Sequence, residues 1–117
     1  MSKTFVVPEE LLARCVGRVD LAQRVVDTFV QLLKVDVPQL VELVRDGDGE
    51  GAAKMAHRIK GSSANVAAEP LRKCAELIEQ LAKDGDLADE QIELRRLEET
   101  WNDYVQQTES FLSQPQP

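Results

Sequence analysis

The 117-residue sequence contains few aromatic residues, only two cysteines and a single histidine. Phe, Tyr and Trp together make up 4% of the chain, so a hydrophobic core must be built mainly from Leu, Val, Ile and Ala. One histidine and two scattered cysteines cannot complete the ligand shell of a zinc site, and we expect no bound metal. Cys15 and Cys74 lie far apart in apolar helical contexts, which favours reduced core thiols over a disulfide.

The chain also has no excess of positive charge and no long hydrophobic run. Acidic residues outnumber basic ones by 21 to 14, giving a formal net charge of −7, which disfavours nucleic acid or an anionic membrane as a partner. No apolar stretch approaches the roughly 20 residues of a membrane span, and the first residues lack the hydrophobic region of a signal peptide. We therefore expect a cytoplasmic protein.

Apolar residues recur at spacings of three and four, the period of an amphipathic helix. A proline and two glutamates at positions 8–10 are typical of a helix start, and this short helix is predicted to end near Gly17. The clearest stripe lies between about 19 and 45 and keeps its phase across Pro38, which predicts one long, kinked helix. The stripe consists of Ala22, Val26, Phe29, Leu33, Val37, Leu40 and Val44.

Turn signals divide the rest of the chain into three helices. Asp48, in a Gly- and Asp-rich turn, is a suitable N-cap for a helix over about 49–66. A further helix is predicted from Glu69 to the KDGD stretch, and the last from about 87 to 112. We predict an all-α fold, an antiparallel four-helix bundle with a short additional N-terminal helix. Residues 1–117 are expected to form a single domain with an ordered core over about 8–112 and a frayed tail at 113–117.

The helix predicted over 49–66 carries the only histidine, His57, and presents two different faces. At 100° per residue, the core face consists of Ala52, Met55, Ile59, Ser62, Ser63 and Val66. His57 projects from nearly the opposite side. Its expected neighbours on that outer face are Ala53, Lys54, Gly61 and Ala64, with Arg58 and Lys60 on the flanks.

This outer face is unusual for one that only contacts solvent. Small side chains leave the imidazole accessible to another protein, and Gly61 costs the helix about 1 kcal/mol. Lys54 and Lys60 place positive charge near His57 in an otherwise acidic chain. Taken singly, these residues also fit an ordinary surface histidine, a solvated lysine and a close helix crossing at the glycine.

The combination fits capture of a phosphoryl group by a neutral imidazole nitrogen. The ring is an adequate nucleophile near neutral pH, and phosphoryl transfer depends mainly on positioning and on neutralising the phosphoryl oxygens. Lys60 would supply part of that charge. The hydroxyl of Ser62 is a further candidate contact, although both Ser62 and Ser63 are expected to tilt inward.

The stretch 56–68, AHRIKGSSANVAA, resembles the signature of histidine-containing phosphotransfer (HPt) domains, in which His-x-Leu-Lys-Gly-Ser precedes Ser or Ala. The wider chain is similar as well, with Phe29 and Pro38 in the preceding helix and LRKCAELIEQLAKDGD after the signature. The resemblance covers roughly residues 8–112.

Two positions depart from the usual pattern. Ile59 stands where leucine is usual, which is a conservative core exchange. Ala67 stands where glycine is common, and we expect it to lengthen its helix slightly and to alter the turn into the next one.

The resemblance implies a four-helix phosphocarrier of a two-component phosphorelay. His57 would accept the phosphoryl group on Nε2, Lys60 would steady it, and Gly61 would admit the active-site loops of a receiver domain. The Mg²⁺ that assists transfer belongs to the receiver, so no cofactor of its own is expected. Supporting roles are assigned to Lys54, Arg58, Ser62 and Ala64.

In many HPt domains a carboxylate or amide of the next helix hydrogen-bonds the other ring nitrogen and sets the tautomer. Glu79 is the first candidate for that position, with Gln80 and Glu76 as alternatives, and Lys83 would extend the basic rim.

The expected partners are response-regulator receiver domains and a hybrid sensor histidine kinase, with the chain acting as a monomer and not as an enzyme. One alternative is a helical adaptor that binds a receiver or kinase through the same face without being phosphorylated. A weaker one is a self-associating structural bundle. The initial methionine and short tail favour a free-standing protein over a piece of a larger kinase.

Overall fold

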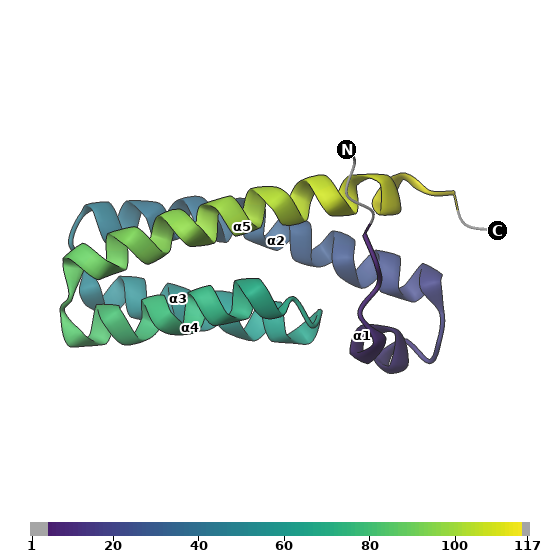
Figure 1. Ribbon diagram of the computed structural model, residues 1–117, viewed down its shortest axis with the longest axis horizontal. Coiled ribbons are helices and arrows are strands. Elements are labelled where there is room, and N and C mark those ends of the chain that lie inside the picture. Colours follow the sequence, from purple (N-terminus) through teal and green to yellow (C-terminus); the bar gives the residue numbers. More distant parts are fainter. Residues whose placement is uncertain (1–4, 116–117) are drawn as a thin grey trace.

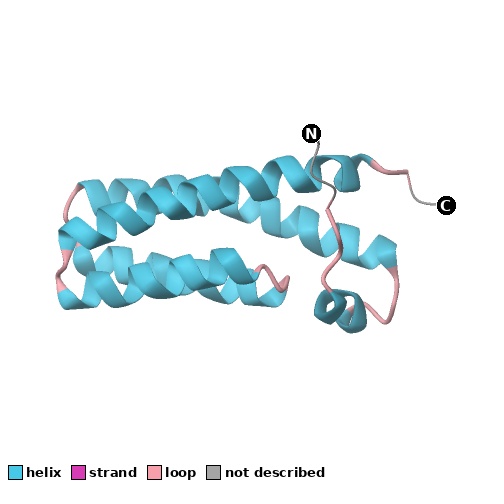
Figure 2. Cartoon of the chain, viewed as in Figure 1, coloured by secondary structure: helices cyan, strands magenta, loops and turns pink. Residues whose placement is uncertain are grey.

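The computed structural model describes residues 5–115, and within them the chain forms five α-helices and no strand (Figures 1 and 2). The helices are α1 (Glu9–Arg14), α2 (Val19–Arg45), α3 (Gly49–Asn65), α4 (Glu69–Asp84) and α5 (Leu87–Ser113). The all-α prediction is confirmed. The long helix α2 continues through Pro38 as predicted, and α5 ends one residue beyond the predicted Leu112. The last part of the predicted tail, 116–117, lies outside the described residues.

The four longer helices form a bundle around a common core. Helix α2 packs against α3 and α5, and α4 packs against the same two helices. Short turns join consecutive helices, which run in opposite directions (Figure 1). Figure 1 also shows that α2 and α5 extend past the shorter α3–α4 hairpin, and that α1 lies beyond the end of that hairpin.

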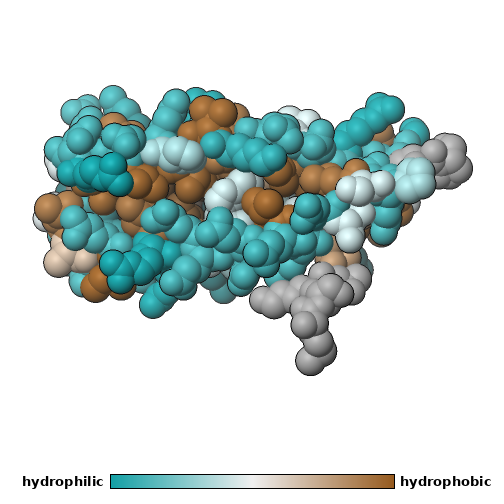
Figure 3. Space-filling model, turned by 90° about the horizontal axis from the view of Figure 1, so that it is seen from above, coloured by the Kyte–Doolittle hydropathy of each residue, from teal (hydrophilic) through white to brown (hydrophobic). Residues whose placement is uncertain are grey.

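The core is aliphatic along most of the bundle and aromatic towards one end. Leu33, Leu40, Ile59 and Leu97 are fully buried, and each such side chain stabilises the fold by roughly 1.5–3 kcal/mol. The aromatic cluster comprises Phe5, Phe29, Trp101, Tyr104 and Phe111, whose rings meet edge-to-face, tilted or stacked. Both cysteines are free thiols buried in the core, as predicted. An apolar band between two polar rows follows the side of the bundle formed by α2 and α5 (Figure 3).

The end of α3 differs from the prediction. Ala67 does not lengthen the helix, which ends at Asn65, and its φ of +56° lies in the left-handed region. The chain must reverse there into α4, and the Ala68 N–H donates to the carbonyl of Ser63 to close the turn. Glycine adopts this conformation freely, whereas alanine is strained by about 1–2 kcal/mol.

A side chain of α1 completes the same helix end. The last turn of α3 contains no basic residue of its own. Arg14 Nη1 instead donates to the carbonyl oxygens of Ala64 and Asn65, each at 3.0 Å. The Ala64 carbonyl also accepts from the Ala67 N–H, so the arginine adds a second donor there and places a cation at the negative end of the helix dipole.

Candidate functional site

His57 is held on a firmly anchored helix, with its own side chain in solvent. At the start of α3, the Gly51 N–H donates to Asp48 Oδ1 at 2.8 Å, which is the predicted N-cap. Along the helix, the core face is buried at Ala52, Ala56, Ile59 and Ser63. The His57 side chain is 67% exposed. The helix therefore fixes the position of the imidazole, while one side of the ring stays accessible.

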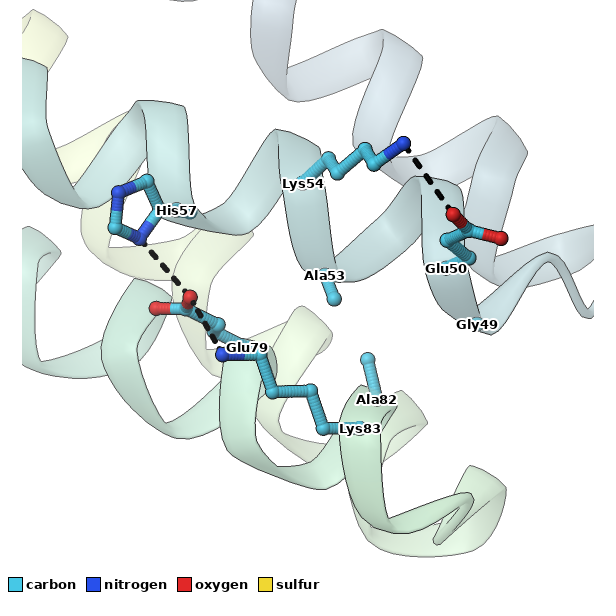
Figure 4. Close-up of a pocket in the computed structure, with 8 residues that line it drawn as sticks. All are labelled: Gly49, Glu50, Ala53, Lys54, His57, Glu79, Ala82 and Lys83. Atoms are coloured by element: carbon cyan, nitrogen blue, oxygen red, sulfur yellow. Dashed lines mark hydrogen bonds and ion pairs between the residues drawn. The ribbon is translucent and has the colours of Figure 1, made fainter.

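The outer face of α3 is narrower than predicted. Ala53 was expected beside His57 on the exposed surface, and this is wrong, because Ala53 is only 8% exposed. Helix α4 packs against that flank, and the side chains of Ala53 and Ala82 point toward one another (Figure 4). Met55 and Ser62, which were expected in the core, are only half-buried. Lys54, Arg58, Gly61 and Ala64 are exposed as expected.

A single carboxylate on α4 brings together three of the predicted site residues. His57 Nδ1 lies 2.9 Å from Glu79 Oε2, and Lys60 Nζ donates to Oε1 of the same carboxylate at 2.8 Å. Lys83 Nζ lies 3.2 Å from Oε2 (Figure 4). The two alternatives for holding the ring are engaged elsewhere, Glu76 with Arg72 and Gln80 with Asp84.

The ionisation of Glu79 determines which nitrogen of the His57 ring carries the proton. Burial, with 11% of the side chain exposed, raises the pKa of Glu79, but the hydrogen bonds from Lys60, Lys83 and His57 outweigh it and lower the pKa to about 2. An ionised carboxylate can only accept, so Nδ1 is the donor in its contact with His57. In the neutral ring, the lone pair is then on Nε2, which points away from Glu79 (Figure 4).

The remaining predicted cations are engaged away from Glu79. Lys54 pairs with Glu50 at 3.3 Å. Arg58 Nε lies 3.1 Å from Oδ2 of Asp36 on α2, an ion pair whose angle does not make a well-aligned hydrogen bond. Asp36 is 2% exposed and was missed by the sequence analysis, although its spacing of three after Leu33 already placed it beside the buried stripe.

Depressions lie on both flanks of α3, and the one between α3 and α4 borders the imidazole. A depression of about 600 Å³ lies between α3 and α4 and is lined by Gly49, Glu50, Ala53, Lys54, His57, Glu79, Ala82 and Lys83 (Figure 4). A second of about 300 Å³ lies between α2 and α3 and includes Phe29, Leu32 and Ser62. Within residues 5–115, no cluster of three or more His, Cys, Asp or Glu side chains is placed to hold a metal ion.

The sequence model of the Hpt domain family matches residues 24–111, which include the imidazole and its carboxylate partner. The chain belongs to the Hpt domain family. Hpt domains take part in histidine phosphotransfer in phosphorelays, interact with receiver domains, and are phosphocarriers rather than true enzymes. Comparison with curated proteins and with solved structures gives no match. None of the described helices has both the length and the hydropathy that a membrane crossing requires.

The glycine after the lysine of this Hpt domain is not required by packing within the chain. A Cβ added at Gly61 would meet no other atom within 4 Å. At Gly51, by contrast, an added Cβ would lie 2.5 Å from Asp48 Oδ2 and 2.8 Å from Leu43 Cδ2, so the capping carboxylate and the leucine would both have to move. The lack of a side chain at Gly61 leaves space only on the outside of the bundle, one helical turn from His57.

Proposed function

We propose that His57 accepts a phosphoryl group on Nε2 from the phosphoaspartate of a receiver domain and passes it to the aspartate of another receiver. The observation that carries the proposal is the contact of Nδ1 with the buried, ionised Glu79. This contact leaves the outward-facing Nε2 as the nucleophilic nitrogen of a largely exposed ring.

The residues around the imidazole suit that transfer. In the proposed step, the Nε2 lone pair forms a bond to phosphorus while the phosphorus–oxygen bond of the aspartyl phosphate breaks and the aspartate leaves as carboxylate. Nδ1 keeps its proton, and its contact with Glu79 holds the ring in the orientation of the attack. The ammonium of Lys60 has three N–H donors and gives one to Glu79, which leaves others for the phosphoryl oxygens. The Mg²⁺ that assists transfer is assigned to the receiver, and this chain needs no cofactor.

The receiver is proposed to dock over the exposed faces of α2 and α3. On α2, Val25 and Val35 are 37% and 56% exposed and belong to one stripe with the half-buried Leu21 and Leu32. On α3, Gly61 has no side chain, so a partner can approach the helix backbone closely there. An apolar strip beside an accessible nucleophile is typical of a protein-binding surface.

The test is phosphoryl transfer from labelled, phosphorylated receivers to the wild-type chain and to His57→Gln. We expect label on the wild type that is lost in acid and stable in base, and no label on the variant, with thermal melting unchanged. Label on another residue, or none with any receiver of the source organism, would refute the proposal. A receiver that binds both proteins without labelling either would instead favour the adaptor function.

A further inference from the structure

The second lysine at Glu79 is not accounted for by the proposed transfer. Glu79 Oε1 is already occupied by Lys60, and Oε2 is shared by His57 and Lys83. Lys83 lies one turn after Glu79 on α4, and its side chain is 58% exposed. Glu79 and Lys83 form an i,i+4 ion pair, which is common on helices, but here the same oxygen also holds the ring, so the pair places a second cation on the carboxylate that contacts His57.

A carboxylate beside an imidazole has two opposing effects on a nucleophile. It fixes the proton on Nδ1, which leaves the Nε2 lone pair free. It also stabilises the doubly protonated ring, which has no lone pair and cannot attack phosphorus. A carboxylate that orients the ring without favouring its cationic form must therefore have its charge balanced by other groups.

Lys60 and Lys83 are the two cations that contact this carboxylate among the described residues. Other charged groups of α3 near the ring are paired elsewhere, Lys54 with Glu50 and Arg58 with Asp36 of α2.

On α4, the surface next to His57 also includes Lys73 and Glu76. Glu76 pairs with Arg72, and Lys73 is not among the groups that contact Glu79. Lys60 offsets the charge of Glu79, and Lys83 adds a further positive charge next to the same oxygen that holds the ring.

We propose that Lys83 is a positioning residue that acts through Glu79, balancing the carboxylate so that it can hold Nδ1–H while the ring stays unprotonated on Nε2. The inference rests on the proposed role of His57 as the nucleophile. The low pKa of Glu79, about 2, agrees with it, because the carboxylate stays ionised throughout the pH range in which an imidazole titrates.

The single histidine makes a direct test possible, because the imidazole ¹⁵N signals of the whole chain arise from His57 alone. We expect the NMR titration midpoint of Lys83→Met to move to higher pH by about 0.5 unit, about a threefold rise in the ratio of protonated to neutral ring at a given pH. Lys83→Arg keeps the wild-type midpoint. Lys73→Met, which removes the same charge from the same helix without touching Glu79, moves the midpoint less than half as far.

The same substitution in a Glu79→Gln background separates an indirect effect from a direct one. If Lys83 acts through the carboxylate, Lys83→Met moves the midpoint less than half as far in the Glu79→Gln background as in the wild-type background. An equal movement in both backgrounds would mean that Lys83 acts on the ring through space, and no movement in either would mean that it does not act at all. Both results overturn the inference, and thermal melts verify that each variant is folded.

Transfer kinetics give a second, independent test. We expect Lys83→Met to accept phosphoryl groups about threefold more slowly below the titration midpoint and at the wild-type rate at high pH. Equal slowing at every pH would indicate direct contact with the receiver or the phosphoryl group and would overturn the inference. If no receiver labels the wild type, the proposed function fails, while the NMR titration still decides whether Lys83 controls the ring.

Discussion

Arg58 of α3 and Asp36 of α2 are joined across the interface between their helices, with 3.1 Å between Nε and Oδ2. The carboxylate is almost completely buried, whereas 58% of the arginine side chain is exposed. The ion pair therefore holds Arg58, the residue after His57, against α2, the helix that carries the exposed Val35. Removing the arginine would leave a buried carboxylate without a cation, whereas removing the aspartate would leave an arginine that solvent can reach.

Arg58→Met is expected to destabilise the protein by about 1–2 kcal/mol, because it leaves a buried carboxylate without its cation. This loss of stability is smaller than that for a fully buried pair, because solvent reaches the guanidinium of Arg58. Urea unfolding measures the change. The double variant Asp36→Leu/Arg58→Met removes both charges and should recover most of the loss. If Arg58→Met is as stable as the wild type, the pair makes no net contribution.

The pH dependence of stability should reveal the ion cluster around Glu79. Although burial raises the pKa of Glu79, its hydrogen bonds lower it from 4.5 to about 2. The unfolded chain therefore takes up this proton first as the pH falls. The stabilisation is fully present above about pH 5 and is lost as the pH falls from 4.5 towards 2.

We expect the free energy of unfolding of the wild type to fall by about 1–2 kcal/mol more than that of Glu79→Gln over this range. Partial exposure of Lys60 and Lys83 limits the size of the effect. Urea melts of both proteins at several pH values measure the difference. Parallel curves for the two proteins would show that the cluster does not stabilise the folded state.

Ala67→Gly is expected to raise the free energy of unfolding by about 0.5–1 kcal/mol, because position 67 has φ +56°. Relief of that strain exceeds the added entropy of the unfolded chain. Ala64→Gly is the matched control, since Ala64 lies within α3 and should lose about 1 kcal/mol on the same exchange. If the melting temperatures of the two variants shift in the same direction, the strain assigned to position 67 is contradicted.

Substitutions at Gly61 should separate stability from transfer. Gly61→Ala is expected to stabilise the protein by about 0.5–1 kcal/mol, because the added methyl group meets nothing within the chain. Gly61→Gln should also be at least as stable as the wild type but should slow transfer at least tenfold, by obstructing the docked receiver. Melting temperatures and single-turnover rates measure both properties. Wild-type transfer by Gly61→Gln would remove the proposed reason for the glycine.

The helices could be predicted closely because their ends carry local signals. Asp48 and Asp86 cap α3 and α5 through their own side chains, and Gly85 ends α4 in the left-handed conformation. Such preferences depend on a few neighbouring residues, so they can be predicted without tertiary structure. The end of α3 could not be predicted in this way, because the reversal of the chain into α4 imposes on Ala67 a conformation that alanine does not favour.

The sequence indicated several residues that lie around His57, but it did not indicate which of them contact one another. A helical wheel places His57, Gly61 and Ala64 outward, but it does not show which flank a neighbouring helix covers, and Ala53 was misplaced for that reason. Glu79 was one of three candidates on α4, and only the packing of α3 against α4 distinguishes it. The contact of Asp36 with Arg58 joins residues 22 positions apart on consecutive helices, and it follows from the fold alone.

The cap that Arg14 forms on α3 has a consequence for where this module begins. The family match starts at residue 24, inside α2, and so leaves out Arg14 and the buried Leu11 and Ala22. A fragment cut at that boundary would lose the first turn of α2 and the arginine that contacts the carbonyls of Ala64 and Asn65. The packed unit is therefore larger than the segment that sequence similarity delimits, because residues ahead of the match contribute to its core and to the end of α3.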